Sequence, residues 1–181
     1  MKALCVLLAA SVGTIASLPV RAQPAAAQAD ALERRVKAVF VFKFASFVDW
    51  PAEQLEHPDA PIQIAVMGEE AVVRDIADAA GSRTVEGRRV LARRVEPGDL
   101  LDGVHILFLR DSAFARLAEG LPPQPMLVVT ETPGALARGS VVNFVVDDGR
   151  VRFDISLESA ERRGLKLSSR LITVARNVIG R

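Results

Sequence analysis

Cysteine is nearly absent from this chain of 181 residues: the only one is Cys5, inside an apolar run at the N-terminus. If that run is removed as a leader, the rest of the chain can form no disulfide in an oxidising compartment. Thiol chemistry and cysteine-based metal sites are then excluded as well. Tyrosine is absent altogether and only two histidines occur, so few of the side chains that commonly carry acid–base catalysis are present.

The chain also lacks a strong net charge and the common catalytic motifs. Its formal net charge is +1, which gives no reason to expect a nucleic-acid partner. No GxxxxGK, GxGxxG, HExxH or GxSxG segment occurs. His57 lies in a loop next to proline, and His105 lies in an apolar strand, where we expect a packed, hydrogen-bonded core residue. The residues alone indicate no enzyme, and we expect no catalytic residues, cofactor or metal.

Residues 1–22 have the features of a cleavable signal peptide. A positive charge at the start is followed by the apolar run ALCVLLAASVGTIASL, and residues 20–22 offer a cleavage site before Gln23. Cys5 lies far ahead of that site, which argues against a lipid anchor. No second apolar run is long enough to span a membrane. We therefore expect an exported, soluble chain in which residues 23–33 form a linker or a frayed lead-in to the first helix.

The segment 34–51 holds more than half of the aromatic side chains and should contribute much of the core. These aromatic residues are Phe40, Phe42, Phe44, Phe47 and Trp50, of eight phenylalanines and one tryptophan in the chain. Val36, Phe40, Phe44 and Phe47 recur at helical spacing, and Pro51 is a stop signal. Three of the aromatics also alternate as in a strand, but the length of the segment favours a helix. We predict a core helix, with a membrane-surface or partner-binding helix as the alternative.

The middle of the chain alternates between apolar strands and amphipathic helices. Its pattern predicts strands at 62–68, 104–110 and 125–131, helices at 69–80 and 111–120, and a hairpin or extended arm at 83–95. Strands separated by helices imply a mostly parallel sheet with helices on both faces. We predict a single three-layer α/β domain over residues 34–181, with a sheet of about five or six strands.

Residues 141–155 (VVNFVVDDGRVRFDI) predict an antiparallel hairpin around Asp148-Gly149. A two-residue turn there places Asp147 opposite Arg150 and Asn143 opposite Asp154. One face of the hairpin is then apolar, with Val142, Phe144, Val146, Val151, Phe153 and Ile155. The other face carries Asn143, Arg152 and Asp154. That polar face is either solvated or a contact site for a ligand or a partner.

The last segment, 165–179, predicts a C-terminal helix packed on the sheet near the first helix. Its apolar stripe consists of Leu167, Leu171, Val174, Ala175 and Val178, and its polar side includes Lys166 and Arg170. We expect the polar faces of the hairpin and of this helix to be neighbours and to contact a partner. The expected partner-binding residues are Asn143, Arg152, Asp154, Lys166 and Arg170, with Arg152 foremost because arginine is enriched at interface hot spots.

VKAVFVFKFASFVDWP resembles the opening signature of the YfiR-like family, whose members begin with a VKAAFLYNFAKFVEWP-type segment. The resemblance continues in order through IQIAVMGEE, TVEGRRVLARRV, VHILFLRDS and the stretch from PMLVVTE to LITVAR. Its most specific part is GSVVNFVVDDGRVRFDI followed by GLKLSSRL. Phe42 and Lys43 stand where members often have Tyr and Asn, a change that leaves the helix intact.

The resemblance implies a periplasmic repressor that binds the periplasmic region of an inner-membrane diguanylate cyclase and lowers cyclic di-GMP. It leaves open a related sensor as the partner, and a homodimer. The alternative is a periplasmic small-ligand-binding module that serves uptake or chemosensing. Some relatives carry cysteine pairs that link redox state to regulation. This chain has only Cys5, so the resemblance implies no redox switch here.

Overall fold

The computed structural model describes residues 25–55, 57, 59–117 and 124–180. The predicted signal peptide lies outside the described residues. The first described element is α1 (Ala25–Phe44), so residues 25–33 belong to the helix and do not form a linker. The helix ends seven residues before the expected stop at Pro51. It is followed by a short 3-10 helix, η1 (Ala45–Phe47), and a two-residue strand, β1 (Val48–Asp49).

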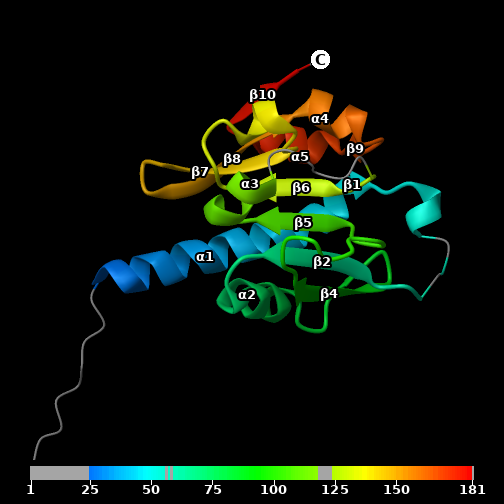
Figure 1. Cartoon of the computed structure of the whole chain (residues 1–181), viewed down its shortest axis with the longest axis horizontal. Coiled ribbons are helices and arrows are strands. Elements are labelled where there is room, and N and C mark those ends of the chain that lie inside the picture. Colours follow the sequence, from blue (N-terminus) through cyan, green and yellow to red (C-terminus); the bar gives the residue numbers. More distant parts are fainter. Residues whose placement is uncertain (1–24, 56, 58, 118–123, 181) are drawn as a thin grey trace, which may run out of the picture.

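A mostly parallel sheet forms the centre of the molecule (Figure 1). In the described residues it has eight strands, in the order β10-β8-β7-β6-β5-β2-β4-β3. The strands are β2 (Ile62–Met67), β3 (Thr84–Val85), β4 (Arg88–Arg94), β5 (Ile106–Leu109), β6 (Leu127–Thr130), β7 (Val142–Asp147), β8 (Arg150–Ser156) and β10 (Asn177–Ile179). Only the β7–β8 and β3–β4 pairs are antiparallel. The sheet exceeds the expected five or six strands because the short β3 and β10 add to its two edges.

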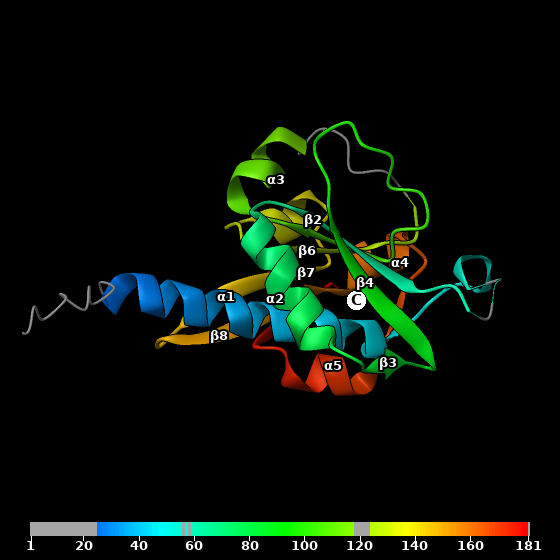
Figure 2. The ribbon, with the colours of Figure 1, turned by 90° about the horizontal axis from the view of Figure 1, so that it is seen from below.

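The remaining helices connect or flank the strands. They are α2 (Glu70–Ala80), α3 (Asp111–Leu117), α4 (Leu157–Arg162), α5 (Ser169–Val174) and the 3-10 helices η2 (Ala52–Gln54) and η3 (Ala135–Arg138). The helix predicted for 111–120 is described only to Leu117, since residues 118–123 lie outside the described part. Figure 2 shows α1 and α2 on one side of the sheet and α3 on the other.

The central strands bury side chains on both of their faces. Along β2, Ile62, Ile64 and Val66 belong to the larger core cluster, together with residues of α1 and α2. Ala65 and Met67 belong to a second cluster, which includes residues of α3. Successive strand residues point to opposite faces, so a nearly continuous apolar run is what a strand covered on both sides requires.

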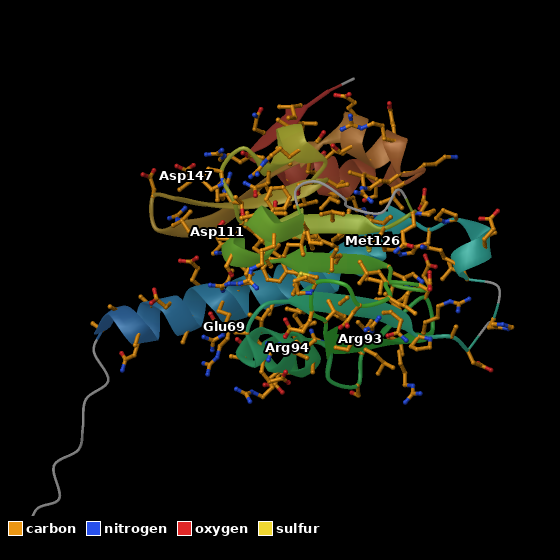
Figure 3. All side chains as sticks on the ribbon, viewed as in Figure 1. Glu69, Arg93, Arg94, Asp111, Met126 and Asp147 are labelled. Carbon is orange, nitrogen blue, oxygen red and sulfur yellow. The ribbon has the colours of Figure 1, made fainter. Side chains whose placement is uncertain are left out.

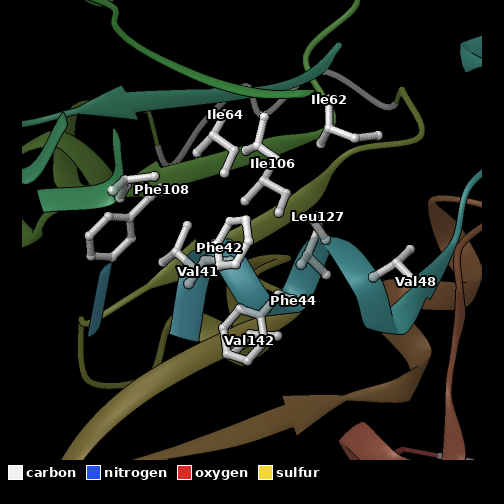
Figure 4. Close-up of a cluster of buried hydrophobic side chains, with 14 of the residues drawn as sticks. Val41, Phe42, Phe44, Val48, Ile62, Ile64, Ile106, Phe108, Leu127 and Val142 are labelled. Atoms are coloured by element: carbon white, nitrogen blue, oxygen red, sulfur yellow. The ribbon is translucent and has the colours of Figure 1, made fainter. Parts of the chain in front are cut away.

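The aromatic segment supplies the centre of the larger core. The ring centroid of Phe44 lies 5.1 Å from that of Phe153 and 5.8 Å from that of Phe144, and all three side chains are buried. Phe40 and Phe47, which we also expected to be buried, are half-buried and pack against this cluster. Val41 and Phe42 take their place on the buried face of α1, where they meet the strands of the sheet (Figure 4).

The predicted DG hairpin is confirmed, including its register. Asp147 pairs with Arg150, Val145 with Arg152 and Asn143 with Asp154. Asp148 and Gly149 both have positive φ, 47° and 69°, which a tight two-residue turn of this kind requires. The apolar face is buried only near the base of the hairpin. Val146 is 54% exposed, because the tip projects past the end of the sheet (Figure 1).

The predicted C-terminal helix over 165–179 is wrong. This segment forms β9 (Lys166–Leu167), α5 and β10 in succession. Ser168 caps α5 by accepting a hydrogen bond from the backbone N of Leu171 at 3.3 Å. The chain then turns extended at Ala175, and β10 pairs in parallel with β8.

Two physical features explain this outcome. Ile172, Thr173 and Val174 are β-branched and therefore favour a long helix only weakly. The free edge of β8 also offers backbone hydrogen bonds that a helix could not use, and the backbone N of Arg176 donates to Phe153 O at 2.8 Å. The segment nevertheless lies beside η1, which directly follows the first helix, since the backbone N of Ser168 donates to Phe47 O at 2.9 Å.

His105 is a packed core residue, as predicted. It is 3% exposed, its Nδ1 accepts a hydrogen bond from the backbone N of Gln63 at 3.2 Å, and its ring meets Trp50 edge-on. Burial is the main cause that lowers the pKa of His105 below its usual value of 6.5.

Candidate functional site

The parallel strands β2, β5 and β6 end on one side of the sheet, and charged residues follow each of them. Glu69 follows β2 after one glycine, Arg110 and Asp111 follow β5, and Glu131 follows β6. From β2 the chain continues to β4 on one side, whereas from β5 it continues to β6 on the other. Open α/β sheets bind ligands outside the carboxyl ends of the strands, at such a reversal of strand order.

Figure 3 shows this side of the molecule. Glu69, Asp111 and Asp147 lie toward it, together with the first half of α1, whereas Met126, which precedes β6, lies toward the opposite side. The tip of the β7–β8 hairpin and the first half of α1 both extend past the strand ends here (Figure 1). The carboxyl ends of the strands are therefore flanked by two projecting elements.

A buried ionic network lies at these strand ends. The Glu131 side chain is 8% exposed, and its Oε2 accepts a hydrogen bond from Lys37 Nζ at 2.8 Å. Its Oε1 is 2.7 Å from Arg110 Nε. Lys37 Nζ also donates to Glu33 Oε1 at 2.5 Å. Removing charged groups from water is costly unless they are paired, so Glu131 needs both cations, and the network joins α1 to the ends of β5 and β6.

Gly68 makes room for the Arg110 side chain. A Cβ atom at position 68 would lie 2.5 Å from Arg110 Cγ, closer than non-bonded carbon atoms can approach. The glycine at the end of β2 therefore lets Arg110 cross over the backbone and reach Glu131. A larger residue would displace the guanidinium from the site.

Asn143 on β7 is buried, with 6% of the residue exposed, and its side-chain amide is held in a single orientation. Its Oδ1 accepts hydrogen bonds from Thr130 Oγ1 at 2.7 Å and from the backbone N of Thr132 at 3.0 Å. A backbone N–H can only donate, so the oxygen of the amide must face Thr132. The two threonines flank Glu131, which places Asn143 next to the ionic network.

Asp154 on β8 lies directly opposite Asn143 in the hairpin. Its two oxygens accept hydrogen bonds from Arg176, at 2.8 Å from Nε and 2.6 Å from Nη2. This two-pronged contact joins β8 to the residue before β10 and raises the pKa of Arg176 above its usual value. The Arg176 side chain remains 38% exposed.

These groups line one open cleft of about 670 Å³. Its charged and polar residues are Glu33, Lys37, Arg110, Asp111, Glu131, Asn143, Asp154 and Arg176. Pro133, Leu136, Val145 and Val146 are among its apolar residues. The volume lies in the range of small-molecule sites, which combine apolar walls with a few placed polar groups.

The structure brings together two of the five residues expected to bind a partner. Asn143 and Asp154 both line the cleft. Arg152 is exposed near the hairpin turn, beside Asp147, Asp148 and Arg150 in a shallow depression. Lys166 lies in the separate two-stranded sheet formed by β1 and β9, and Arg170 lies in α5. The latter two therefore do not line the cleft.

Sequence reasoning missed Lys37, Arg110, Glu131 and Arg176. A signal existed for two of them, because Arg110 and Glu131 each come directly after a buried strand whose carboxyl end should face a crevice. Lys37 gave no signal, since it lies within an aromatic helix and looks like a residue on the solvent side. Arg176 was not identified because the segment 165–179 was wrongly predicted to form a helix.

Two further properties concern the described residues alone. No group of three histidine, cysteine, aspartate or glutamate side chains is arranged to hold a metal ion in this part of the chain. No helix among these residues has both the length and the apolar character needed to cross a membrane.

Comparison with known proteins gives one finding about identity. Residues 34–176 match a protein-family model described as YfiR/HmsC-like. The match begins in α1 and ends at Arg176, so it includes every residue of the cleft named above except Glu33. No curated protein matches the chain.

Proposed function

The chain belongs to the YfiR/HmsC-like family, and on this basis we propose that it is a periplasmic regulatory protein that represses an inner-membrane diguanylate cyclase. Repression occurs when the protein binds the periplasmic region of the cyclase and lowers the production of cyclic di-GMP. The observation that carries the proposal is the family match over residues 34–176. Family members are regulators rather than enzymes, and a regulator of this kind needs only a surface that favours one state of its partner.

The projecting hairpin is the surface that we propose for the partner. Its tip is exposed at Val146, and Arg150 and Arg152 lie on one face of β8, with Asp147 and Asp148 beside them. The base of the hairpin is fixed by the buried pairs of Asn143 and Asp154, so the tip is presented by a rigid element. Lys166 and Arg170 are exposed as well, at separate places, and serve as secondary contacts.

Deletion of the gene tests the proposal in cells. Loss of the repressor should raise cyclic di-GMP, with more biofilm and less motility. Expression of the exported protein should reverse these changes, whereas a form without residues 1–22 should not, because it cannot reach the periplasm. Unchanged cyclic di-GMP in the deletion strain, with a cyclase partner expressed, would instead favour a small-ligand-binding module for uptake or chemosensing.

Substitution of Arg152 tests the surface. Arg152→Ala should abolish repression and leave the melting temperature nearly unchanged, because the side chain is exposed and makes no ion pair among the described residues. Arg116→Ala, an exposed arginine on α3, is a matched control that should repress normally. If Arg152→Ala unfolds the protein, the residue is structural; if repression survives, the partner binds elsewhere.

A further inference from the structure

The acids of the cleft are already satisfied by groups of the protein. Glu131 Oε2 accepts a hydrogen bond from Lys37 and Oε1 forms an ion pair with Arg110, and both oxygens of Asp154 accept hydrogen bonds from Arg176. Asp111 accepts a hydrogen bond from Thr132 at 2.5 Å. The four acids of the lining are therefore partnered internally, even though they outnumber its three bases.

The donors of the cleft are not satisfied in the same way. Asn143 Oδ1 is held by two donors, so the amide cannot flip, and its Nδ2 group makes no hydrogen bond with the described residues. Asn143 is only 6% exposed as a residue, and it lines the cleft. The Nδ2 atom itself still contacts solvent in the cleft, since it is not one of the fully buried side-chain atoms that lack a hydrogen-bond partner among the described residues. Because its orientation is fixed and no group of the described residues accepts from it, this N–H₂ group is available to a molecule bound in the cleft.

Two guanidinium groups of the cleft also have N–H donors that no group of the described residues accepts from. Arg176 uses Nε and Nη2 on Asp154, and Arg110 uses Nε on Glu131, so Nη1 of each arginine makes no hydrogen bond within the described ranges. Both side chains are partly exposed and line the same cleft as Asn143. Planar arginine donors and a fixed amide N–H₂ are suited to the oxygens of a carboxylate or a phosphate.

We propose that this cleft binds a small ligand whose oxyanion group, a carboxylate or a phosphate, is held by Asn143 Nδ2, Arg110 and Arg176. The rest of the ligand lies against Pro133, Leu136, Val145 and Val146, which line the same cleft. The surrounding acids offset the positive charge of the cleft, so that an anion does not bind there through its charge alone. Selection therefore depends on hydrogen-bond geometry rather than on net charge. This inference does not depend on the proposed repression of a cyclase.

The side-chain amide of Asn143 offers a direct readout. The chain has only two asparagines, Asn143 and Asn177, and Asn177 is exposed on β10 and does not line the cleft. In ¹⁵N-labelled protein, phenylacetate and inorganic phosphate are titrated separately, with 2-phenylethanol as the neutral counterpart of phenylacetate. A Kd in the millimolar range is expected for probes of this size. The Asn143 N–H₂ signals should shift with an oxyanion probe, and those of Asn177 should remain still.

Two variants and one control test the assignment. Asn143→Asp keeps an oxygen for Thr130 and Thr132 but replaces the free N–H₂ donor with a second oxygen. This variant should therefore not bind the probe, and binding is measured as the increase in melting temperature that the probe causes. Arg176→Gln keeps a shorter donor and should weaken binding about tenfold, the effect of losing one charge-assisted hydrogen bond. Arg150→Gln, near the hairpin turn and outside the cleft lining, should bind as the wild type does.

The outcomes separate clearly. Shifts with phenylacetate alone identify a carboxylate ligand with an apolar body, and shifts with phosphate alone identify a phosphorylated one; both support the proposal. If 2-phenylethanol shifts the Asn143 amide as strongly as phenylacetate, the oxyanion plays no role and the proposal is wrong. It is equally wrong if no probe moves this amide, or if Arg176→Gln and Arg150→Gln bind the probe alike. Should Asn143→Asp fail to fold, Arg176→Gln still decides.

Discussion

Glu131 shows how strongly one residue can depend on its surroundings. It follows β6 directly, its side chain is 8% exposed, and it pairs with Lys37 of α1 and with Arg110, which follows β5. Removal of one partner from a buried ionic group leaves the other charges uncompensated. The same carboxylate thus has two consequences: it joins α1 to the sheet, and it orients two cations of the cleft.

The first prediction follows from this arrangement. Glu131→Gln should lower the free energy of unfolding by about 3 kcal/mol, because it leaves Lys37 and Arg110 without their shared carboxylate. Glu33→Gln is the matched control: this acid pairs with the same lysine but is 37% exposed, and its loss should cost less than about 1 kcal/mol. Urea denaturation of both variants provides the measurement. Equal costs would show that the burial of Glu131 contributes nothing to its importance.

The second prediction concerns His105 and pH. Because burial, assisted by the nearby positive charge of Arg88, lowers its pKa below 6.5 in the folded protein, the unfolded chain binds the proton more readily. The contribution of His105 is therefore fully favourable above pH 6.5, and stability is lost as the pH falls below that value. His105→Asn should flatten the decline of the melting temperature between about pH 7 and about pH 5.

The exposed His57 provides the control for this experiment. His57→Asn removes the other histidine of the chain, whose side chain is exposed, and the slope of its pH profile is compared with that of His105→Asn. Carboxylates also titrate over part of this range, so the comparison uses the difference between variant and wild type. A decline in His105→Asn as steep as in the wild type would show that protonation of His105 does not limit stability.

At the scale of the element, the hairpin supports the third prediction. Phe153 is 2% exposed and packs against Phe44 and Phe40, so Phe153→Ala should destabilise the protein by about 3–5 kcal/mol. Val146→Ala changes a residue that was predicted to lie on the same face but is 54% exposed, and it should cost less than about 0.5 kcal/mol. Thermal unfolding of the two variants compares the base of the hairpin with its tip. A small loss for Phe153→Ala would contradict the observed packing.

The hairpin also shows how far local patterns determine structure. The turn residues Asp148 and Gly149 and the alternation around them specify the register without any information from the rest of the chain. The same reasoning failed at 165–179, where an apolar spacing of helical type was overruled by a distant strand edge on β8. Local patterns cannot show which edge is free, because that depends on the arrangement of the whole sheet.

The candidate site was predictable to a similar extent. Asn143 and Asp154 were identified as a polar pair because hairpin register alone places them opposite each other. Their partners Thr132 and Arg176 belong to other elements, so the pattern gave no sign that the pair is buried rather than solvated. Lys37 and Glu131 are 94 residues apart, and only the tertiary fold brings their charges together.

At the scale of the whole molecule, removal of the predicted leader would leave stability to non-covalent interactions. The only cysteine is Cys5, in the predicted leader, so the exported chain beginning at Gln23 would contain no thiol. A domain of roughly 150 residues buries enough surface to fold without covalent links. Here two apolar clusters, one on each face of the central strands, provide that burial. If the leader is removed, we expect no response to oxidants through disulfides of the chain itself.

The fourth prediction tests leader removal and redox insensitivity together. Protein recovered from the periplasm should have the mass of a chain whose first residue is Gln23. Treatment with iodoacetamide under denaturing conditions should not increase this mass. Its melting temperature should be the same with and without dithiothreitol, because no disulfide exists to be reduced. Protein retained in the cytoplasm with residues 1–22 attached is the control, and it should take up one alkyl group at Cys5. Alkylation of the periplasmic protein would mean that the leader is kept, in which case the chain stays attached to the membrane through its apolar N-terminus and reaches its partner as an anchored protein rather than by diffusion.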